Sequence, residues 1–287
     1  MLFLNVLQGK ISMNIRAFKK LFILFIACAT FFVFSAQEAF AVRVSLKRII
    51  FEGKTRSEVL TIINNTGESQ TYRLGWRKYK MDERDALKPI EEGADDSGIL
   101  WADNMLRFAP RRVTIPAGSS QQVRLLLRRP SDIQNAEYRS HLWIVTESKP
   151  EQFDLQANNN QQAIRLAVQP AISLPVFVRH GDLDVSANIS DTRLTKTAKG
   201  LNIDFAINRD GDSSIYGDID FVCNDNGTVL RQVRGISVYP EINKRYLSFN
   251  LPLENGPCNT VGIEYRADPK DKKFQGATLA KATASLN

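Results

Sequence analysis

The stretch Q-A-I-R-L-A-V-Q-P-A-I-S-L-P-V-F-V-R, from Gln162 to Arg179, decides the fold class of this chain. Its apolar residues occupy alternate positions, and a period of two predicts one long β-strand. The apolar positions are Ile164, Leu166, Val168, Ile172, Leu174, Val176 and Val178. Strands usually have about 5–6 residues, so we expect this one to extend beyond its own sheet.

Two prolines restrict the position of this strand in a sheet. Pro170 and Pro175 have no backbone N–H to donate, which favours the edge of a sheet or a bulge over a central position. A long edge strand that presents a row of aliphatic side chains is prone to pair with another chain. Either the fold hides this edge, or the pairing is the function.

The rest of the chain, from Val42 onward, consists of short alternating runs without a convincing amphipathic helix. The runs as far as the long strand number about seven in about 140 residues, which is typical of an immunoglobulin-like sandwich. R-H-G-D at Arg179–Asp182 interrupts the pattern, and a second alternating region follows. We therefore predict an all-β chain with two tandem immunoglobulin-like β-sandwiches, residues 42–180 and residues 181–287.

The first run of the mature region, V-R-V-S-L-K-R-I-I-F-E-G, changes its apolar parity between Leu46 and Ile49. A change of parity moves the apolar side chains to the other face of a strand. This run therefore predicts a kink or a switch from one sheet to the other.

Residues 1–41 have the pattern of a cleaved signal peptide. A basic segment at residues 14–20 precedes a short apolar core at residues 21–34, and Ala39 and Ala41 provide an A-x-A cleavage site. A membrane anchor is the alternative, but the apolar core is shorter than the roughly 20 residues that a spanning helix needs. Translation could start at Met1 or at Met13.

Charge and cysteine content narrow the class of protein further. Cleavage after Ala41 removes four basic residues and one acidic residue, so the formal charge falls from +7 to +4. No basic run is long enough to indicate nucleic-acid binding. Cleavage also removes Cys28 and leaves Cys223 and Cys258, which in a secreted chain favour one disulfide over two buried free thiols. We expect a protein without stable membrane insertion.

The sequence contains no recognisable catalytic constellation. His141 and His180 are the only histidines; the first lies in an alternating strand and the second in the expected linker. No phosphate loop, dinucleotide fingerprint or nucleophile motif is present, and the two cysteines have no histidine nearby that would complete a zinc site. We expect a protein that binds without catalysing, with no cofactor and no metal.

Three motifs, taken together, carry a resemblance to one family. They are S-L-K-R-I-I-F-E-G at residues 45–53, P-R-R-V-T-I-P-A-G-S-S-Q-Q-V-R-L at Pro110–Leu125, and E-Y-R-S-H-L at Glu137–Leu142. Together they resemble the periplasmic pilus-assembly chaperones of the chaperone–usher pathway. The resemblance covers the whole mature chain and is densest from Pro110 to Arg179.

The resemblance implies two immunoglobulin-like domains in an L-shaped arrangement and a periplasmic location. It also implies donor-strand complementation, in which the chaperone lends a strand to a pilin or fimbrial subunit until an outer-membrane usher receives it. Ile164, Leu166 and Val168 would be the lent side chains, and ordinary core packing is their alternative role. The resemblance leaves open whether the free protein caps its own strand by forming a dimer.

The family holds the C-terminal carboxylate of the subunit with two basic residues. Arg48 matches the first of them, and a surface ion pair is its alternative role. The second departs from the family pattern, because this chain has Ser173, or Pro175 if the register shifts by two. Arg139 in E-Y-R-S-H-L is a plausible replacement on the neighbouring strand.

Two other functions remain open at the level of sequence. The first is a secreted two-domain adhesion or binding protein that uses its loop tips. The second is an enzyme with an unrecognised site.

Overall fold

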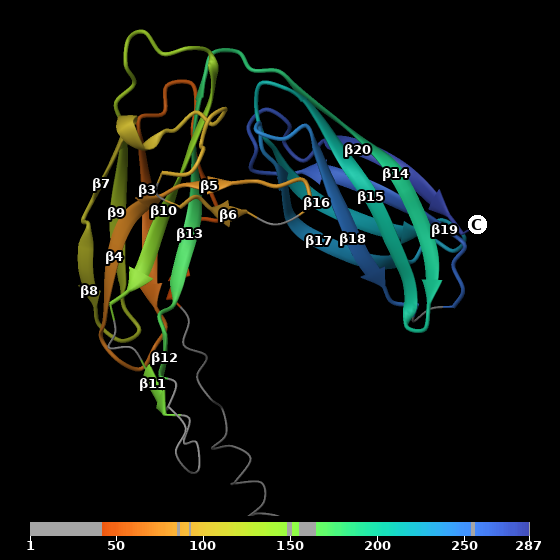
Figure 1. Ribbon diagram of the computed structural model, residues 1–287, viewed down its shortest axis with the longest axis horizontal. Coiled ribbons are helices and arrows are strands. Elements are labelled where there is room, and N and C mark those ends of the chain that lie inside the picture. The colour runs from red at the N-terminus through yellow and green to blue at the C-terminus, as the bar shows by residue number, and fades with distance from the viewer. Residues whose placement is uncertain are drawn as a thin grey trace, which may run out of the picture. The chain divides into compact units, whose positions relative to one another are not determined.

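The computed structural model describes residues 42–84, 87–91, 93–147, 151–154, 165–253 and 256–286. The signal-peptide prediction therefore lies outside the described residues. In these residues, the regular structure is strands and one short 3₁₀ turn at Asp103–Met105, so the all-β prediction is confirmed (Figure 1). Among the described residues, no helix is long and apolar enough to cross a membrane.

The first half of the chain forms two packed sheets. One has the order β1-β3-β9-β7, and the other has the order β2-β13-β10-β4-β8. The strands are β1 (Val42–Val44), β2 (Ile49–Phe51), β3 (Ser57–Asn64), β4 (Gln70–Arg77), β7 (Leu106–Ala109), β8 (Arg112–Ile115), β9 (Ser120–Leu127), β10 (Ala136–Thr146) and β13 (Ala171–His180). β1 and β2 belong to different sheets, so the change of parity after Leu46 is a switch between sheets, as predicted.

Alternate side chains of both sheets meet in one core. Leu60 and Leu125, from the first sheet, and Ile144 and Val176, from the second, are each fully buried. This is the arrangement in which two antiparallel sheets bury one face each. At the intervening positions, Phe177 on β13 and Arg139 on β10 contact the second half of the chain.

The stretch from Gln162 to Arg179 is not one strand, which corrects the prediction. β12 (Arg165–Val168) ends before Gln169 and Pro170, and β13 begins at Ala171. Pro170 cannot donate to a ladder, while the side chain of Gln169 donates to the carbonyl of Thr146 (2.7 Å). The backbone of β12 pairs with β11 (Glu151–Asp154) in a separate two-stranded ribbon.

The second half of the chain forms another pair of sheets, of order β14-β15-β18 and β17-β16-β19-β20. Their strands are β14 (Val185–Thr197), β15 (Gly200–Gly211), β16 (Ile215–Cys223), β17 (Val229–Val238), β18 (Lys244–Leu251), β19 (Thr260–Ala267) and β20 (Thr278–Ser285). Phe205 and Phe221 meet edge to face in the centre of this core, with ring centroids 5.9 Å apart.

The chain passes from the first sandwich to the second through Gly181. Its φ is +84°, and a Cβ atom there would lie 2.3 Å from the side chain of Asn135. A small ribbon of β5 (Tyr79–Lys80) and β6 (Lys88–Pro89) also lies toward the second sandwich, where Tyr246 donates its backbone N–H to the carbonyl of Glu83 (2.7 Å).

Candidate functional site

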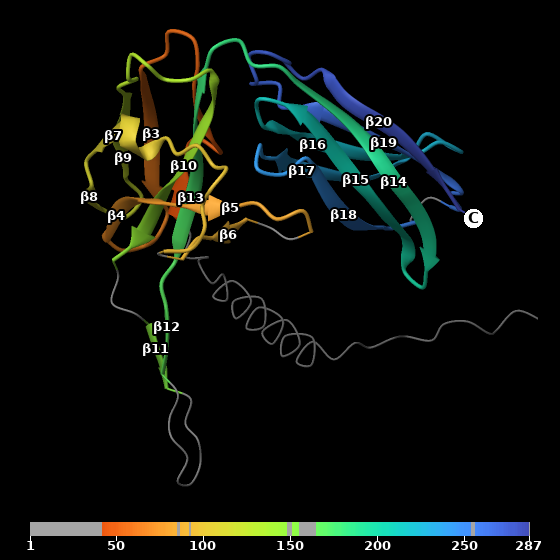
Figure 2. The ribbon, with the colours of Figure 1, turned by 45° about the horizontal axis from the view of Figure 1, so that its top comes forward.

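The candidate site begins at an open edge of β13. On one side, β13 pairs with β10 from Ala171 to His180 (Figure 2). On the other side, it pairs with β2 only at Val176–Val178. Within the described chain, Ala171–Pro175 therefore has no strand on its second side. This half of β13 keeps backbone groups available for pairing.

β13 itself is held on both faces. Leu174, Val176 and Val178 are buried in the core of the first sandwich. On the opposite face, Phe177 packs with Met81 and with Tyr239 of the second sandwich, and the Phe177 and Tyr239 rings meet at 5.7 Å. The open edge therefore continues directly into a segment of β13 that packs against both sandwiches.

Arg48 lies where the covered part of β13 begins. β2 runs parallel to β13 with Ile49 opposite Val176, so Arg48 lies at the level of Pro175. Its guanidinium donates to Asp271 (Nη2 to Oδ2, 3.3 Å) and lies 4.0 Å from the centre of the Tyr216 ring. No other hydrogen bond of this guanidinium occurs among the described residues. Arg48 lines a cleft of about 450 Å³ between the two sandwiches.

Arg179 is the second basic group at Asp271. Its Nη1 lies 3.6 Å from the Asp271 carboxylate, and its Nε donates to Glu137 (2.9 Å). Burial disfavours the charged guanidinium, but the attraction of Glu137, Asp271 and Glu52 outweighs burial and raises the pKa of Arg179. Asp271 is therefore held between Arg48 and Arg179. Its other oxygen accepts the backbone N–H groups of Lys273 (3.0 Å) and Phe274 (3.1 Å).

Arg139 does not join Arg48 in this cleft, which corrects its expected role as the second basic residue. It forms two parallel hydrogen bonds with Glu241, both at 2.9 Å, and a third with the carbonyl of Tyr79 (2.8 Å). Its side chain is only 3% exposed and stacks on Tyr239 at 4.1 Å. The guanidinium is thus committed to a carboxylate of the second sandwich.

His141 lies beside this ion pair, against the ring of Tyr79 at 4.7 Å. Neither of its ring nitrogens has a hydrogen-bond partner among the described residues. Burial, together with the charge of Arg139, lowers the pKa of His141 to about 3. The imidazole is therefore neutral near pH 7 and enclosed, which suits a packing role.

The expected donor residues lie at the edge of what the structure describes. Ile164 is outside the described residues. The backbone of Leu166 pairs with Phe153, and that of Val168 pairs with Glu151. The proposal that these three side chains enter a client therefore rests on the sequence.

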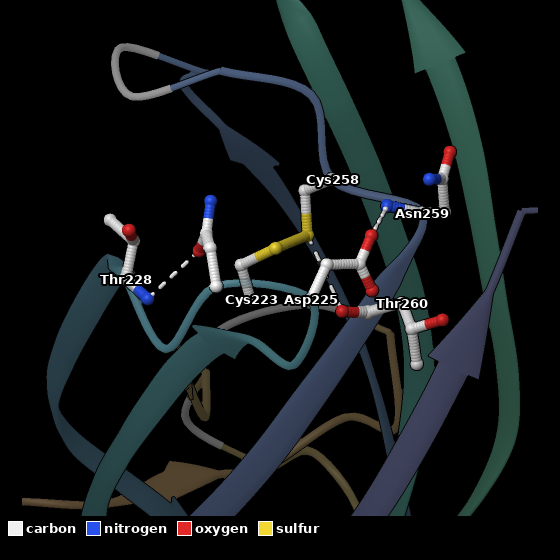
Figure 3. The surroundings of a disulfide bond; sticks show 7 residues. Cys223, Asp225, Thr228, Cys258, Asn259 and Thr260 are labelled. Carbon is white, nitrogen blue, oxygen red and sulfur yellow. Dashed lines mark hydrogen bonds between the residues drawn. A yellow bond between two sulfur atoms is a disulfide. The ribbon is translucent and has the colours of Figure 1, made fainter.

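Cys223 and Cys258 form a disulfide in the second sandwich (Figure 3). It joins the end of β16 to the segment before β19, and both cysteines are buried. Beside it, the carboxylate of Asp225 accepts the backbone N–H of Asn259 (2.7 Å). The bond and this contact together hold two loops at one end of the sandwich.

Sequence reasoning missed Arg179, Glu241 and Asp271 as partners at this site. The sequence could have indicated Arg179, since it is an even number of residues from Ser173 and Pro175 and so lies on the same face of β13. Glu241 and Asp271 had none, because each meets its arginine across a large separation in sequence.

No protein-family model matches this sequence. No curated protein matches it either. Among solved structures, the chain is similar to one in a chaperone–tip adhesin complex of CFA/I fimbriae biogenesis, with 17% identity, a TM-score of 0.42, and coverage of 86% of this chain and 98% of that one.

Two further similar structures come from named organisms. One belongs to the Salmonella enterica SafA pilin–SafB chaperone complex (12% identity, TM-score 0.41, covering 88% of this chain and 99% of that one). The other belongs to the CsuC–CsuE chaperone–tip adhesion subunit complex of Acinetobacter baumannii (9% identity, TM-score 0.44, covering 86% and 99%). Over most of its length, the chain is thus similar to solved structures of chaperones from fimbrial assembly.

Proposed function

We propose that this chain is a periplasmic chaperone that binds pilus or fimbrial subunits by lending them a strand and then delivers them to an outer-membrane usher. The observation that carries the proposal is the half-covered β13, whose open edge at Ala171–Pro175 ends beside Arg48. The three motifs at residues 45–53, Pro110–Leu125 and Glu137–Leu142 support the same function.

The position of Arg48 sets the direction of the bound strand. A client strand on the open edge would meet β2 and Arg48 at the level of Pro175. Its C-terminal carboxylate reaches Arg48 only if the strand runs in the same direction as β13. The client therefore adds in parallel, and a guanidinium that can grip a carboxylate through two hydrogen bonds determines its register.

The affinity would come from backbone pairing and from the lent side chains. Full burial of Ile164, Leu166 and Val168 in client pockets would contribute on the order of 1.5–3 kcal/mol each. Association and ordering offset part of this gain. Because Ala171–Pro175 already pairs with β10 and Leu174 is buried in the core, the chaperone would lose little further conformational freedom along this part of the edge.

The proposed role needs no catalysis. One of the two histidines, His141, is a buried neutral imidazole whose lowered pKa makes it a poor base near neutral pH. The disulfide suits an oxidising compartment, in agreement with the predicted signal peptide.

Co-expression with a fimbrial subunit encoded beside this gene tests the proposal. Arg48→Ala should abolish recovery of the subunit from the periplasm while the chaperone stays folded. Asp271→Ala is the control, because it breaks the contact of Arg48 with the second sandwich, together with that of Arg179, but leaves Arg48 in place. Normal subunit recovery with Arg48→Ala, or equal losses in both variants, would contradict the assignment of Arg48.

A further inference from the structure

A second surface of the first sandwich combines exposed apolar and positively charged side chains. It is the outward face of β9 and its neighbours β3 and β7, in the sheet that does not contain β13. Leu126 on β9 is 41% exposed, and Val59 on β3 is 37% exposed. They are two of the four large apolar side chains that are exposed among the described residues.

Three arginines surround Leu126. Arg124 lies two positions before Leu126 and on the same face of β9, and Arg128 lies two positions after it, directly beyond the end of the strand. Arg107 on β7 is directly opposite Leu126, while Val59 is opposite Arg124. All three arginines are exposed. We call Val59, Arg107, Arg124, Leu126 and Arg128 the arginine face.

No carboxylate neutralises the arginine face within the described part of the chain. Arg124 and Arg128 form no ion pair there, and Arg107 donates only to the nearby carbonyls of Asn104 (3.1 Å) and Leu106 (2.9 Å). Arg112, on the other sheet of this sandwich, does have such a partner, because its Nε lies 2.7 Å from Glu147. The one acidic residue on the four strands of the sheet, Glu58, instead lines the cleft of Arg48.

We propose that the arginine face is a docking surface for an acidic protein partner, one that places carboxylates around an apolar side chain. Such a partner would cover Leu126 and pair its carboxylates with Arg107, Arg124 and Arg128. Each guanidinium can hold a carboxylate in a planar, two-bond geometry. This proposal is independent of the proposed function, because the face and the β13 edge belong to different sheets.

The composition of the face favours a protein over a lipid surface. Arginine is enriched and lysine depleted in protein interfaces, and the strands β1, β3, β7 and β9 contain three arginines and no lysine. Membrane-surface binding relies on a broad apolar face, built from Trp, Phe and Leu, that reaches into the headgroup layer. None of the exposed large apolar residues in the described chain is aromatic.

The test uses an acetylated, amidated pentapeptide, E-E-L-E-E, titrated into the ¹⁵N-labelled protein and followed by NMR. The amide end removes the carboxylate that Arg48 would bind, so the result does not depend on the proposed function. We expect shifts centred on Arg124–Arg128 and Arg107, with an affinity that falls as salt is added. Arg124→Glu and Arg128→Glu should each weaken binding about fivefold or more.

Arg193→Glu is the matched control, since Arg193 is an exposed arginine of the second sandwich, has no ion pair with any described residue, and undergoes the same charge reversal. Leu126→Ser should also weaken binding without altering its salt dependence. The proposal would be overturned by chemical shifts that map to other residues, or by equal effects of Arg124→Glu and Arg193→Glu. It would also be overturned if the protein bound phosphatidylglycerol vesicles and not the peptide, and if Arg124→Glu abolished that vesicle binding.

Discussion

At the scale of single residues, burial converts His141 into a source of pH dependence. Its pKa is about 3 in the folded chain and about 6.5 when unfolded, so the unfolded chain binds the proton first as the pH falls. Stability is therefore present above the unfolded pKa and is lost as the pH falls from about 6.5 toward 3.

The free energy of unfolding should therefore differ measurably between pH 7 and pH 5. His141 should account for a loss of about 2 kcal/mol in the free energy of unfolding over that interval. His141→Phe should lack this component, because phenylalanine does not titrate. Urea denaturation of both proteins at the two pH values measures it, and an identical pH dependence would show that His141 is not held neutral.

At the scale of elements, the alternating apolar residues of one sequence stretch fall on two strands, β12 and β13, for which we expect different roles. Leu174 on β13 is 2% exposed in the core, whereas Leu166 on β12 is proposed to enter a client. Leu174→Ser should destabilise the first sandwich by about 2–5 kcal/mol, because it places a hydroxyl in a cavity. Leu166→Ser should leave the melting temperature close to wild type but abolish co-purification of the subunit.

Thermal melts combined with periplasmic co-purification separate the two cases. A large fall in melting temperature for Leu166→Ser, with the subunit still bound by the protein that remains folded, would contradict the donor-strand proposal.

The disulfide acts at the same scale, by joining β16 to the segment before β19. The two cysteines are 35 residues apart, and closing a loop of this length contributes about 3–4 kcal/mol in the chain-entropy model. The double variant Cys223→Ser, Cys258→Ser should lose about that much stability in chemical denaturation. Thiol titration of the denatured, unreduced protein should find no free thiol; two reactive thiols would contradict the bond.

At the scale of the whole molecule, charged side chains couple the two sandwiches. Arg139 meets Glu241, and Arg48 and Arg179 meet Asp271; each of these contacts joins the first sandwich to the second. Removing one partner of a buried ion pair leaves an uncompensated charge, which typically costs about 3–5 kcal/mol. These contacts should therefore make the two sandwiches unfold together.

Calorimetry tests this coupling. The wild-type protein should melt in one transition, and the double variant Glu241→Ala, Asp271→Ala should melt in two, with the disulfide-bonded second sandwich as one of them. Arg112→Ala, which breaks an ion pair within the first sandwich, is the control and should retain a single transition. A single transition in the double variant would show that other contacts join the sandwiches.

The sequence by itself determined the all-β class, a kink or a switch of sheets after Leu46, and the place of Arg48 in its motif. Each of these depends on local alternation or on a contiguous motif, which a linear chain displays directly. The alternation also predicted one continuous strand across Pro170, because periodicity records which face a residue occupies and not where the ladder ends.

Only the tertiary structure decided which arginine side chains have a carboxylate partner within the chain and which keep N–H donors for another molecule. Arg48, Arg139 and Arg179 look alike in the sequence, yet Glu241 accepts hydrogen bonds from both Nη atoms of Arg139, while Arg48 makes a single hydrogen bond within the described chain and lies beside an open edge. The contacts of Arg139 and Arg48 cross 102 and 223 residues of sequence, respectively. The physical reason is that the energy of a guanidinium depends on burial and on nearby carboxylates, and folding brings both from distant parts of the chain.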